Sequence, residues 1–263
     1  MAGLPDQLKR KLEVSRFANI IYRAIYTSSP SKNLFQDIGF DEDDPDLALI
    51  KDLANDLSDI DHRRPQSHRP FQYCDIDSFL QMYLPEDVLR EELLYPLRNA
   101  SRSRFSHGLR GVWYGALHED TTIAETAYHF VRQARYDLEH ENVKSRTCDR
   151  RMVAVNVASP KSISLVELAG EYPALVDAHD YSLCQRLGDY ALEHGIDLYL
   201  TPSARHLNGI NTPIFQAGIL PENTKTYRYY HFTYHRQHGL SIKRSMHEER
   251  LVEIPESWRI FAP

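Results

Sequence analysis

The spacing of hydrophobic residues predicts several helices, each with one apolar face. After Asp120, apolar side chains recur every three or four residues as far as about Tyr136, which is typical of a helix packed on a core. Similar spacing indicates helices that begin near Asp44 and Asp180, where the aspartate can cap the first turn. Two less regular helices are expected over residues 1–16 and in the segment that ends at Arg98.

Five stretches rich in β-branched and aromatic residues predict strands. They are Ile20–Tyr26, Val112–Leu117, Met152–Val157, Ile196–Leu200 and the segment KTYRYYHFTYH after Pro221. Because strands and helices do not alternate as regular βαβ units, we predict an α+β fold. The polar segment 61–70, broken by two prolines, is the best internal boundary. It divides an N-terminal extension (1–70) from a core (71–263), although we expect one continuous domain overall.

The composition indicates a globular protein without long-range attraction to polyanions. The chain has 263 residues, of which 42% are hydrophobic and 26% charged, and its formal net charge is -6. A mildly acidic protein does not attract nucleic acid or anionic lipid over a distance, so local arginines must hold an anionic substrate. The polar N-terminus and the lack of a long apolar run predict a cytoplasmic protein that binds neither membrane nor nucleic acid directly.

The sequence lacks the common motifs of several enzyme classes and of metal sites. It contains no GxxxxGK[ST], GxGxxG, HExxH or GxSxG motif. The three cysteines are scattered without a CxxC pair, which argues against a disulfide framework and a zinc knuckle. His231, His235 and His238 lie on the last predicted strand without a carboxylate or cysteine at ligand spacing, so we expect a solvated strand face and no metal.

Two segments carry the candidate chemistry. In Ser103–Thr126, Arg104 precedes a turn, Tyr114 lies in a strand and Glu125 lies in the following helix, roughly opposite the apolar face. In Leu198–Phe215, a strand leads to Ser203 and a loop rich in Gly and Asn, residues that allow the backbone to approach a ligand. From spacing alone, a solvated Glu125, a core Tyr114 and a turn-capping Ser203 are the commoner outcomes.

The two segments resemble the RES domain family, named for an Arg, a Glu and a Ser. SRFSHGLRGVWYGALHEDTTIAETAYHF is similar to the central block of the family, and HDYSLCQRLGDYALEHGIDLYLTPSARHLNGINTPIF to its C-terminal block. The likeness extends from about Ile20 to Phe215. The chain departs from the family at Trp113, where a smaller residue is usual, and in the Asn-rich loop after Ser203. The first arginine of the family pattern is Arg23 or its rival Arg69.

The resemblance implies an ADP-ribosyltransferase-like fold, a mixed sheet core with flanking helices and an N-terminal helical extension. It implies an enzyme that breaks the nicotinamide–ribose bond of NAD⁺ without a metal. Arg104, Glu125 and Ser203 would be catalytic, and Arg23, Tyr114, Arg104 and Ser203 would bind NAD⁺. In these roles the arginines hold the pyrophosphate and Tyr114 stacks on the nicotinamide. Glu125 stabilises the positive charge that develops on the ribose, and Ser203 orients the ribose or the carboxamide.

The resemblance also implies a partner and leaves the acceptor open. Members of the family are toxins restrained by an Xre-type helix-turn-helix antitoxin, and we expect an acidic or carboxylate-ended antitoxin segment to pair with Arg104 or Arg23. The acceptor is water or inorganic phosphate. A mono-ADP-ribosyltransferase that modifies a macromolecule is the alternative, although Ile123 stands where such enzymes often carry a second carboxylate. A non-catalytic binding module is a third hypothesis, which the joint presence of the four candidate residues disfavours.

Overall fold

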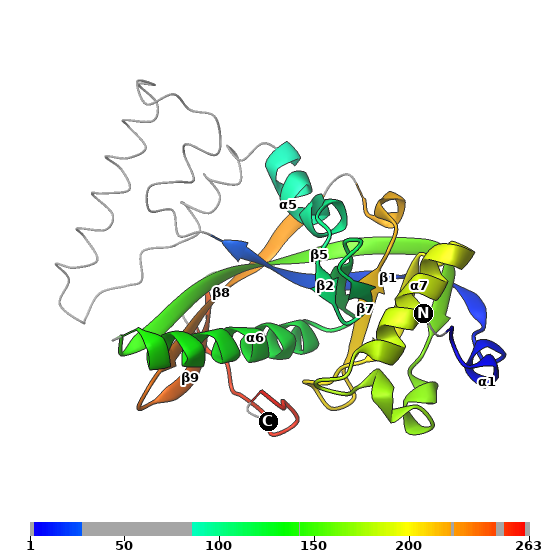
Figure 1. Cartoon of the computed structure of the whole chain (residues 1–263). Helices are drawn as coiled ribbons and strands as arrows, with labels where there is room; N and C mark the ends of the chain where they lie inside the picture. Colours follow the sequence, from blue (N-terminus) through cyan, green and yellow to red (C-terminus); the bar gives the residue numbers. More distant parts are fainter. Residues whose placement is uncertain (1–2, 28–85, 142, 222–223, 246–249, 261–263) are drawn as a thin grey trace.

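The computed structural model describes residues 3–27, 86–141, 143–221, 224–245 and 250–260 (Figure 1). Four helices and ten strands in this part of the chain are α1 (Asp6–Lys9), β1 (Val14–Thr27), α5 (Glu86–Arg98), β2 (Arg102–Ser103), β3 (Ser106–His107), β4 (Trp113–Ala116), α6 (Glu119–His140), β5 (Ser145–Ser164), α7 (Ser182–His194), β6 (Leu198–Pro202), β7 (Ile210–Ile214), β8 (Lys225–His235), β9 (Gly239–Ser245) and β10 (Arg250–Leu251). Short 3-10 helices lie at Glu167–Gly170, Pro173–Leu175 and Ala217–Ile219.

The main sheet is mixed and closes on itself. Its eight strands follow the order β1-β4-β7-β6-β5-β8-β9-β10, and β1 pairs additionally with β5. The strands β1, β4, β7, β6 and β5 therefore form a ring, from which β8, β9 and β10 extend. The pair β5–β6 is parallel and the other pairs in the sheet are antiparallel. The prediction of an α+β fold built on a mixed sheet is confirmed.

Three hydrophobic clusters fill the layers of the fold. One joins α5 to side chains of β1, β4, β5, β6 and β7, and includes Ile21, Leu93 and Trp113. A second lies between α6 and the strands β5, β8 and β9. The third lies beneath α7 and includes Phe105 and Tyr199. In Figure 1, α5 lies on one side of the long β1–β5 pair, and α6 and α7 lie on the other.

The predicted helix after Asp120 is confirmed, with an earlier start and a later end. The helix α6 begins at Glu119 and ends at His140, and its predicted apolar face (Ile123, Ala127, Phe130, Ala134) is buried. The helix α7 follows Asp180, whose carboxylate accepts the N–H of Ser182 at 2.8 Å, and it ends at Gly195 in the left-handed conformation. No helix in the described ranges is long and apolar enough to cross a membrane.

The N-terminal helix over residues 1–16 is a wrong prediction. Only Asp6–Lys9 is helical, because Leu4 and Leu8 turn into the cluster beneath α7 and the chain from Val14 onward pairs with β5. The sequence also gave no sign of β7, whose residues were expected to form a loop. The helix expected at Asp44, the boundary at 61–70 and Arg69 lie outside the described residues. On the described side of that boundary, β1 belongs to the same sheet as the core.

Candidate functional site

Glu125 and Ser203 are hydrogen-bonded to each other, although they lie far apart in the sequence. The Ser203 hydroxyl donates to Oε1 of Glu125 at 2.6 Å, and the Asn211 amide donates to the same oxygen at 2.6 Å. Glu125 lies in the second turn of α6, Ser203 directly after β6 and Asn211 in β7. Glu125 is partly buried. Glu125 is therefore not the solvated side chain that the helical spacing suggested.

The loop after β6 fixes the orientation of the Ser203 hydroxyl. Ser203 is 7% exposed, and its Oγ accepts the backbone N–H groups of Arg205 and His206, each at 3.0 Å. Its own N–H donates to the carbonyl of Gly209 at 2.8 Å. With two donors already pointing at Oγ, the hydroxyl proton is directed at Glu125. The serine thus caps its turn, as spacing alone suggested, and also holds the carboxylate.

Gly209 allows this loop to lie directly against α6. A Cβ at this position would stand 2.8 Å from the side chain of Thr121 and 2.9 Å from Cβ of His206, closer than side chains approach one another. The preceding residue, Asn208, has φ 62°, a left-handed conformation that asparagine tolerates. Thr121 is also hydrogen-bonded to Nδ1 of His206 at 2.9 Å. The loop and the first turns of α6 are therefore locked together.

Two further residues near this loop, Arg205 and Asn211, have no role that the sequence alone indicates. Arg205 is 3% exposed, and its guanidinium stacks on the ring of Tyr128 at 3.4 Å from the centroid. Tyr128 lies in α6, one turn after Glu125. Spacing cannot distinguish this buried arginine from a surface arginine, because its burial depends on α6, which precedes it by many residues.

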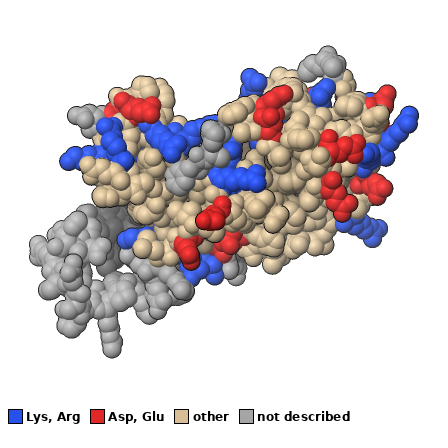
Figure 2. Space-filling model, turned by 90° about the horizontal axis from the view of Figure 1, so that it is seen from below, with Lys and Arg blue, Asp and Glu red and all other residues tan. Residues whose placement is uncertain are grey.

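Three arginines and Glu125 act on the same side chain, His129. The pKa of His129, one turn after Glu125, is lowered by the surrounding protein and further by the charges of Arg132, Arg205 and Arg104, and Glu125 opposes this shift. His129 therefore lies close to Glu125 and to positive charge from the three arginines. Figure 2 shows Lys and Arg side chains gathered near the middle of the face seen from below.

Arg104 is held by backbone carbonyls and by an aromatic ring. Its Nη1 donates to the carbonyl of Asp177 at 2.8 Å and, more weakly, to that of Leu175 at 3.3 Å. The guanidinium lies over the ring of Tyr181, 4.5 Å from the centroid. These contacts use part of its donor set and leave a fixed positive charge that acts on His129, next to Glu125.

Tyr114 anchors the segment that carries Arg104. Its hydroxyl donates to Oγ of Ser103 at 2.9 Å and accepts the N–H of Phe105 at 3.0 Å, so it binds the residues on either side of Arg104. Burial raises its pKa to about 12. The ring packs against the cluster beneath α7. The structure thus shows Tyr114 as a support for Arg104, and the expected contact with a nicotinamide ring stays a prediction.

The side chain of Arg23 lies apart from this cluster. Its neighbours Ile21 and Ile25 on β1 face the cluster beneath α5, whereas Tyr22 and Ala24 pack toward α6. The Arg23 guanidinium stacks on Trp113, 5.1 Å from the ring centroid, and lines a pocket formed with α5. Because side chains alternate along a strand, Arg23 lies on the face of β1 opposite Tyr22 and Ala24, and the structure does not bring it together with Arg104. The expected contact of Arg23 with a pyrophosphate stays a prediction.

The three histidines of β8 and its turn form no cluster with other metal ligands. Within the described residues, no group of three His, Cys, Asp or Glu side chains is placed to hold a metal ion. His231 pairs with Asp149 of β5 at 2.6 Å, and His235 stacks on His238 at 4.6 Å between ring centroids. The sequence could not show the carboxylate beside His231, because it comes from the neighbouring strand.

Comparison with known proteins identifies a family. The family model described as RES domain matches residues 86–235. The solved structures similar to this chain include the crystal structure of the M. tuberculosis MbcT–MbcA toxin–antitoxin complex, which is 12% identical, with 85% of this chain and 88% of that chain covered and a TM-score of 0.42. No match was found among the curated proteins.

Proposed function

The chain belongs to the RES domain family, and from this premise we propose that it degrades NAD⁺ by breaking the bond between nicotinamide and ribose. The observation that carries the proposal is the Glu125 carboxylate, fixed on one oxygen by Ser203 and Asn211 at 2.6 Å each.

The carboxylate suits a reaction in which positive charge develops on a sugar. When the C1′–N bond breaks, its electron pair leaves with the neutral nicotinamide, and the ribose acquires oxocarbenium character. A preorganised carboxylate stabilises such a transition state more than the ground state. Both hydrogen bonds end on Oε1, and within the described ranges Oε2 of Glu125 accepts no hydrogen bond. This oxygen is therefore the one that we assign to the ribose.

The arginines suit the charge of the substrate. NAD⁺ carries a pyrophosphate, and a fixed guanidinium donates to phosphate oxygens in a directional manner. Arg104 was expected in this role, and we add Arg205, which is held rigidly on Tyr128 beside the same helix. Arg205 replaces Arg23 in the proposal, since Arg23 faces the pocket beneath α5.

The acceptor is proposed to be small, either water or inorganic phosphate. In enzymes that modify macromolecules, a second carboxylate two residues before the glutamate often activates the acceptor. Here that position is Ile123, which is 2% exposed and belongs to the cluster beneath α6. Water would yield ADP-ribose and a proton, and phosphate would yield ADP-ribose 1″-phosphate. A mono-ADP-ribosyltransferase remains the alternative, and it would need an activating group from another element.

We further propose that the protein acts as a toxin in a cytoplasm, restrained by an Xre-type antitoxin. An enzyme that empties the NAD⁺ pool of its own cell requires an inhibitor. An acidic or carboxylate-ended segment could pair with Arg104 and compete with the pyrophosphate for the same donors. Saturating NAD⁺ should then weaken antitoxin binding, and Arg104→Ala should weaken the binding of both. An antitoxin that binds equally well with NAD⁺ present must inhibit elsewhere.

The experiment that tests the activity is product identification. Purified full-length protein is incubated with NAD⁺, with and without inorganic phosphate, and the products are identified by mass. Free nicotinamide with ADP-ribose indicates a hydrolase, and nicotinamide with ADP-ribose 1″-phosphate indicates a phosphorylase. Nicotinamide release that depends on an added macromolecule would favour the transferase. Intact NAD⁺ in all arms would contradict the proposal.

A further inference from the structure

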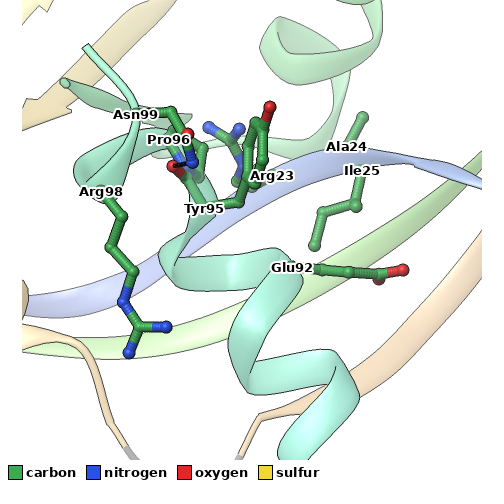
Figure 3. A pocket seen from close by; sticks show the side chains of 8 residues that line it. All are labelled: Arg23, Ala24, Ile25, Glu92, Tyr95, Pro96, Arg98 and Asn99. Carbon is green, nitrogen blue, oxygen red and sulfur yellow. Dashed lines mark hydrogen bonds between the residues drawn. The ribbon is translucent and has the colours of Figure 1, made fainter. Parts of the chain in front are cut away.

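A pocket lies between β1 and α5. Its volume is about 470 Å³, within the range of small-molecule sites. Figure 3 shows the side chains that line it, which come from the end of β1 and the second half of α5: Arg23, Ala24, Ile25, Glu92, Tyr95, Pro96, Arg98 and Asn99. The pocket is separate from the proposed NAD⁺ site, because β1 directs Arg23 away from α6.

Arg23 is partly buried in this pocket, and no carboxylate of the described residues pairs with its guanidinium. Burial lowers its pKa to about 10, and no carboxylate contributes to that shift. Glu92, the lining carboxylate, forms an ion pair with Arg151 instead. Figure 3 shows the Glu92 carboxylate pointing away from Arg23. Removing an unpaired charge from water is costly, so such a group favours an anionic partner.

Arg23 also retains unused hydrogen-bond donors. One Nη1 proton goes to the carbonyl of Tyr114 at 2.6 Å, and the Trp113 ring offers a cation–π contact at 5.1 Å. The buried Nε–H has no partner in the part of the chain that the structure describes. An orphaned buried donor is uncommon in native proteins and indicates a missing acceptor.

We propose that this pocket binds a small anion through Arg23, with a carboxylate or phosphate group as the recognised chemistry. The planar guanidinium matches both groups, and the Tyr95 ring beside it in Figure 3 offers a wall for the rest of the ligand. The site takes its ligand independently of the proposed NAD⁺ chemistry.

The test is a melting experiment that uses inorganic phosphate and acetate as probes, with chloride at matched ionic strength as the reference. A ligand that binds the native state raises the melting temperature in a saturable manner, by roughly 2–8 °C well above its dissociation constant. The wild-type protein should show this rise with phosphate, with acetate or with both, and the stronger of the two identifies the preferred group.

Variants locate the bound anion. Asn99→Asp places a carboxylate inside the pocket at an exposed lining position, so it should abolish the rise. Because the variant also loses the hydrogen bond from Asn99 to the Tyr95 carbonyl, its rise is measured from its own melting temperature without the probes. Asn19→Asp makes the same change at an exposed position of β1 outside the pocket and should keep the rise. Arg104→Ala should also keep it, which separates this pocket from the proposed NAD⁺ site.

The outcomes are distinct. Absence of any saturable rise in the wild-type protein would overturn the proposal, as would an undiminished rise in Asn99→Asp or its loss in Arg104→Ala. NAD⁺ turnover measured on the same samples reports on the proposed function separately, and Asn99→Asp is expected to leave it unchanged.

Discussion

Replacing Asn211 by alanine tests whether the carboxylate of Glu125 must be held in place. The Asn211 amide donates one hydrogen bond of 2.6 Å to Oε1, and Ser203 keeps the second bond in the variant. A hydrogen bond to a charged group contributes about 1.5–3 kcal/mol. If the whole free energy of this hydrogen bond stabilises the transition state, its loss lowers kcat for NAD⁺ cleavage about 10- to 100-fold, because each 1.36 kcal/mol corresponds to a factor of ten.

The matched control is Asn99→Ala. Its amide also donates one hydrogen bond, 2.8 Å long, to a backbone carbonyl, but it lies at the pocket beneath α5. Steady-state kinetics and a melting curve are measured for both variants. We expect Asn211→Ala to lower kcat with little change in KM or melting temperature, and Asn99→Ala to leave kcat unchanged. Equal kcat values for the two variants and the wild-type protein would refute the reasoning.

Three further predictions concern the same region. Gly209→Ala should destabilise the fold by about 1–3 kcal/mol, because the new Cβ would stand 2.8 Å from a threonine of α6, whereas Gly218→Ala, with nothing within 4 Å, should melt like the wild type. Because the pKa of His129 is lowered in the folded state, protonation of this side chain destabilises the fold. Above pH ~6.5 the side chain is neutral and costs no stability, and the free energy of unfolding decreases as the pH falls below this value. Chemical unfolding at pH 7 and pH 5 should therefore show a smaller pH effect in His129→Gln, and an identical effect would show that His129 is not responsible. Arg205→Lys keeps the charge but loses the planar stack, so KM for NAD⁺ should rise while the exposed-site control Arg10→Lys leaves it unchanged.

Hydrophobic periodicity predicted two elements that carry the site, α6 and β4. Both were predictable because their apolar side chains follow one another at regular spacing and are buried. It missed β7, because Ile210–Ile214 combines asparagine, threonine and proline, residues typical of turns. That strand exists because it pairs with β4 on one side and β6 on the other. Pairing between distant segments leaves no local signal, and for the same reason Asn211 was not assigned to the site.

The placement of Arg23 depends on strand register in a similar way. The sequence places it in β1, but a shift of one residue would turn it to the other face. The register is set by the partners of β1, which pair Tyr22 with Ala116 and Arg23 with Val153. The resemblance to the family singled out Glu125 and Ser203, which the structure joins by a hydrogen bond. The helical spacing alone could not have shown this contact.

The C-terminal segment adds a support that the sequence did not indicate. The N–H of Leu207 donates to the carbonyl of Ser257 at 2.9 Å, and the N–H of Arg259 donates to that of Arg205 at 2.7 Å. Trp258 is buried in the cluster beneath α6. This segment therefore ties the loop after Ser203 to the helix that carries Glu125, although it lies beyond the residues matched by the family model.

The most direct test of the account is to measure the rate at which the Glu125→Gln variant consumes NAD⁺. The substitution keeps the size of the side chain and its capacity to accept hydrogen bonds but removes the charge, which should lower kcat by at least ~10²–10³. Glu139→Gln makes the same change at an exposed position of the same helix and serves as the control. The account predicts that wild-type protein and Glu139→Gln consume NAD⁺ at equal rates, while Glu125→Gln, folded with an unchanged circular dichroism spectrum, does not. Undiminished NAD⁺ consumption by Glu125→Gln would contradict it.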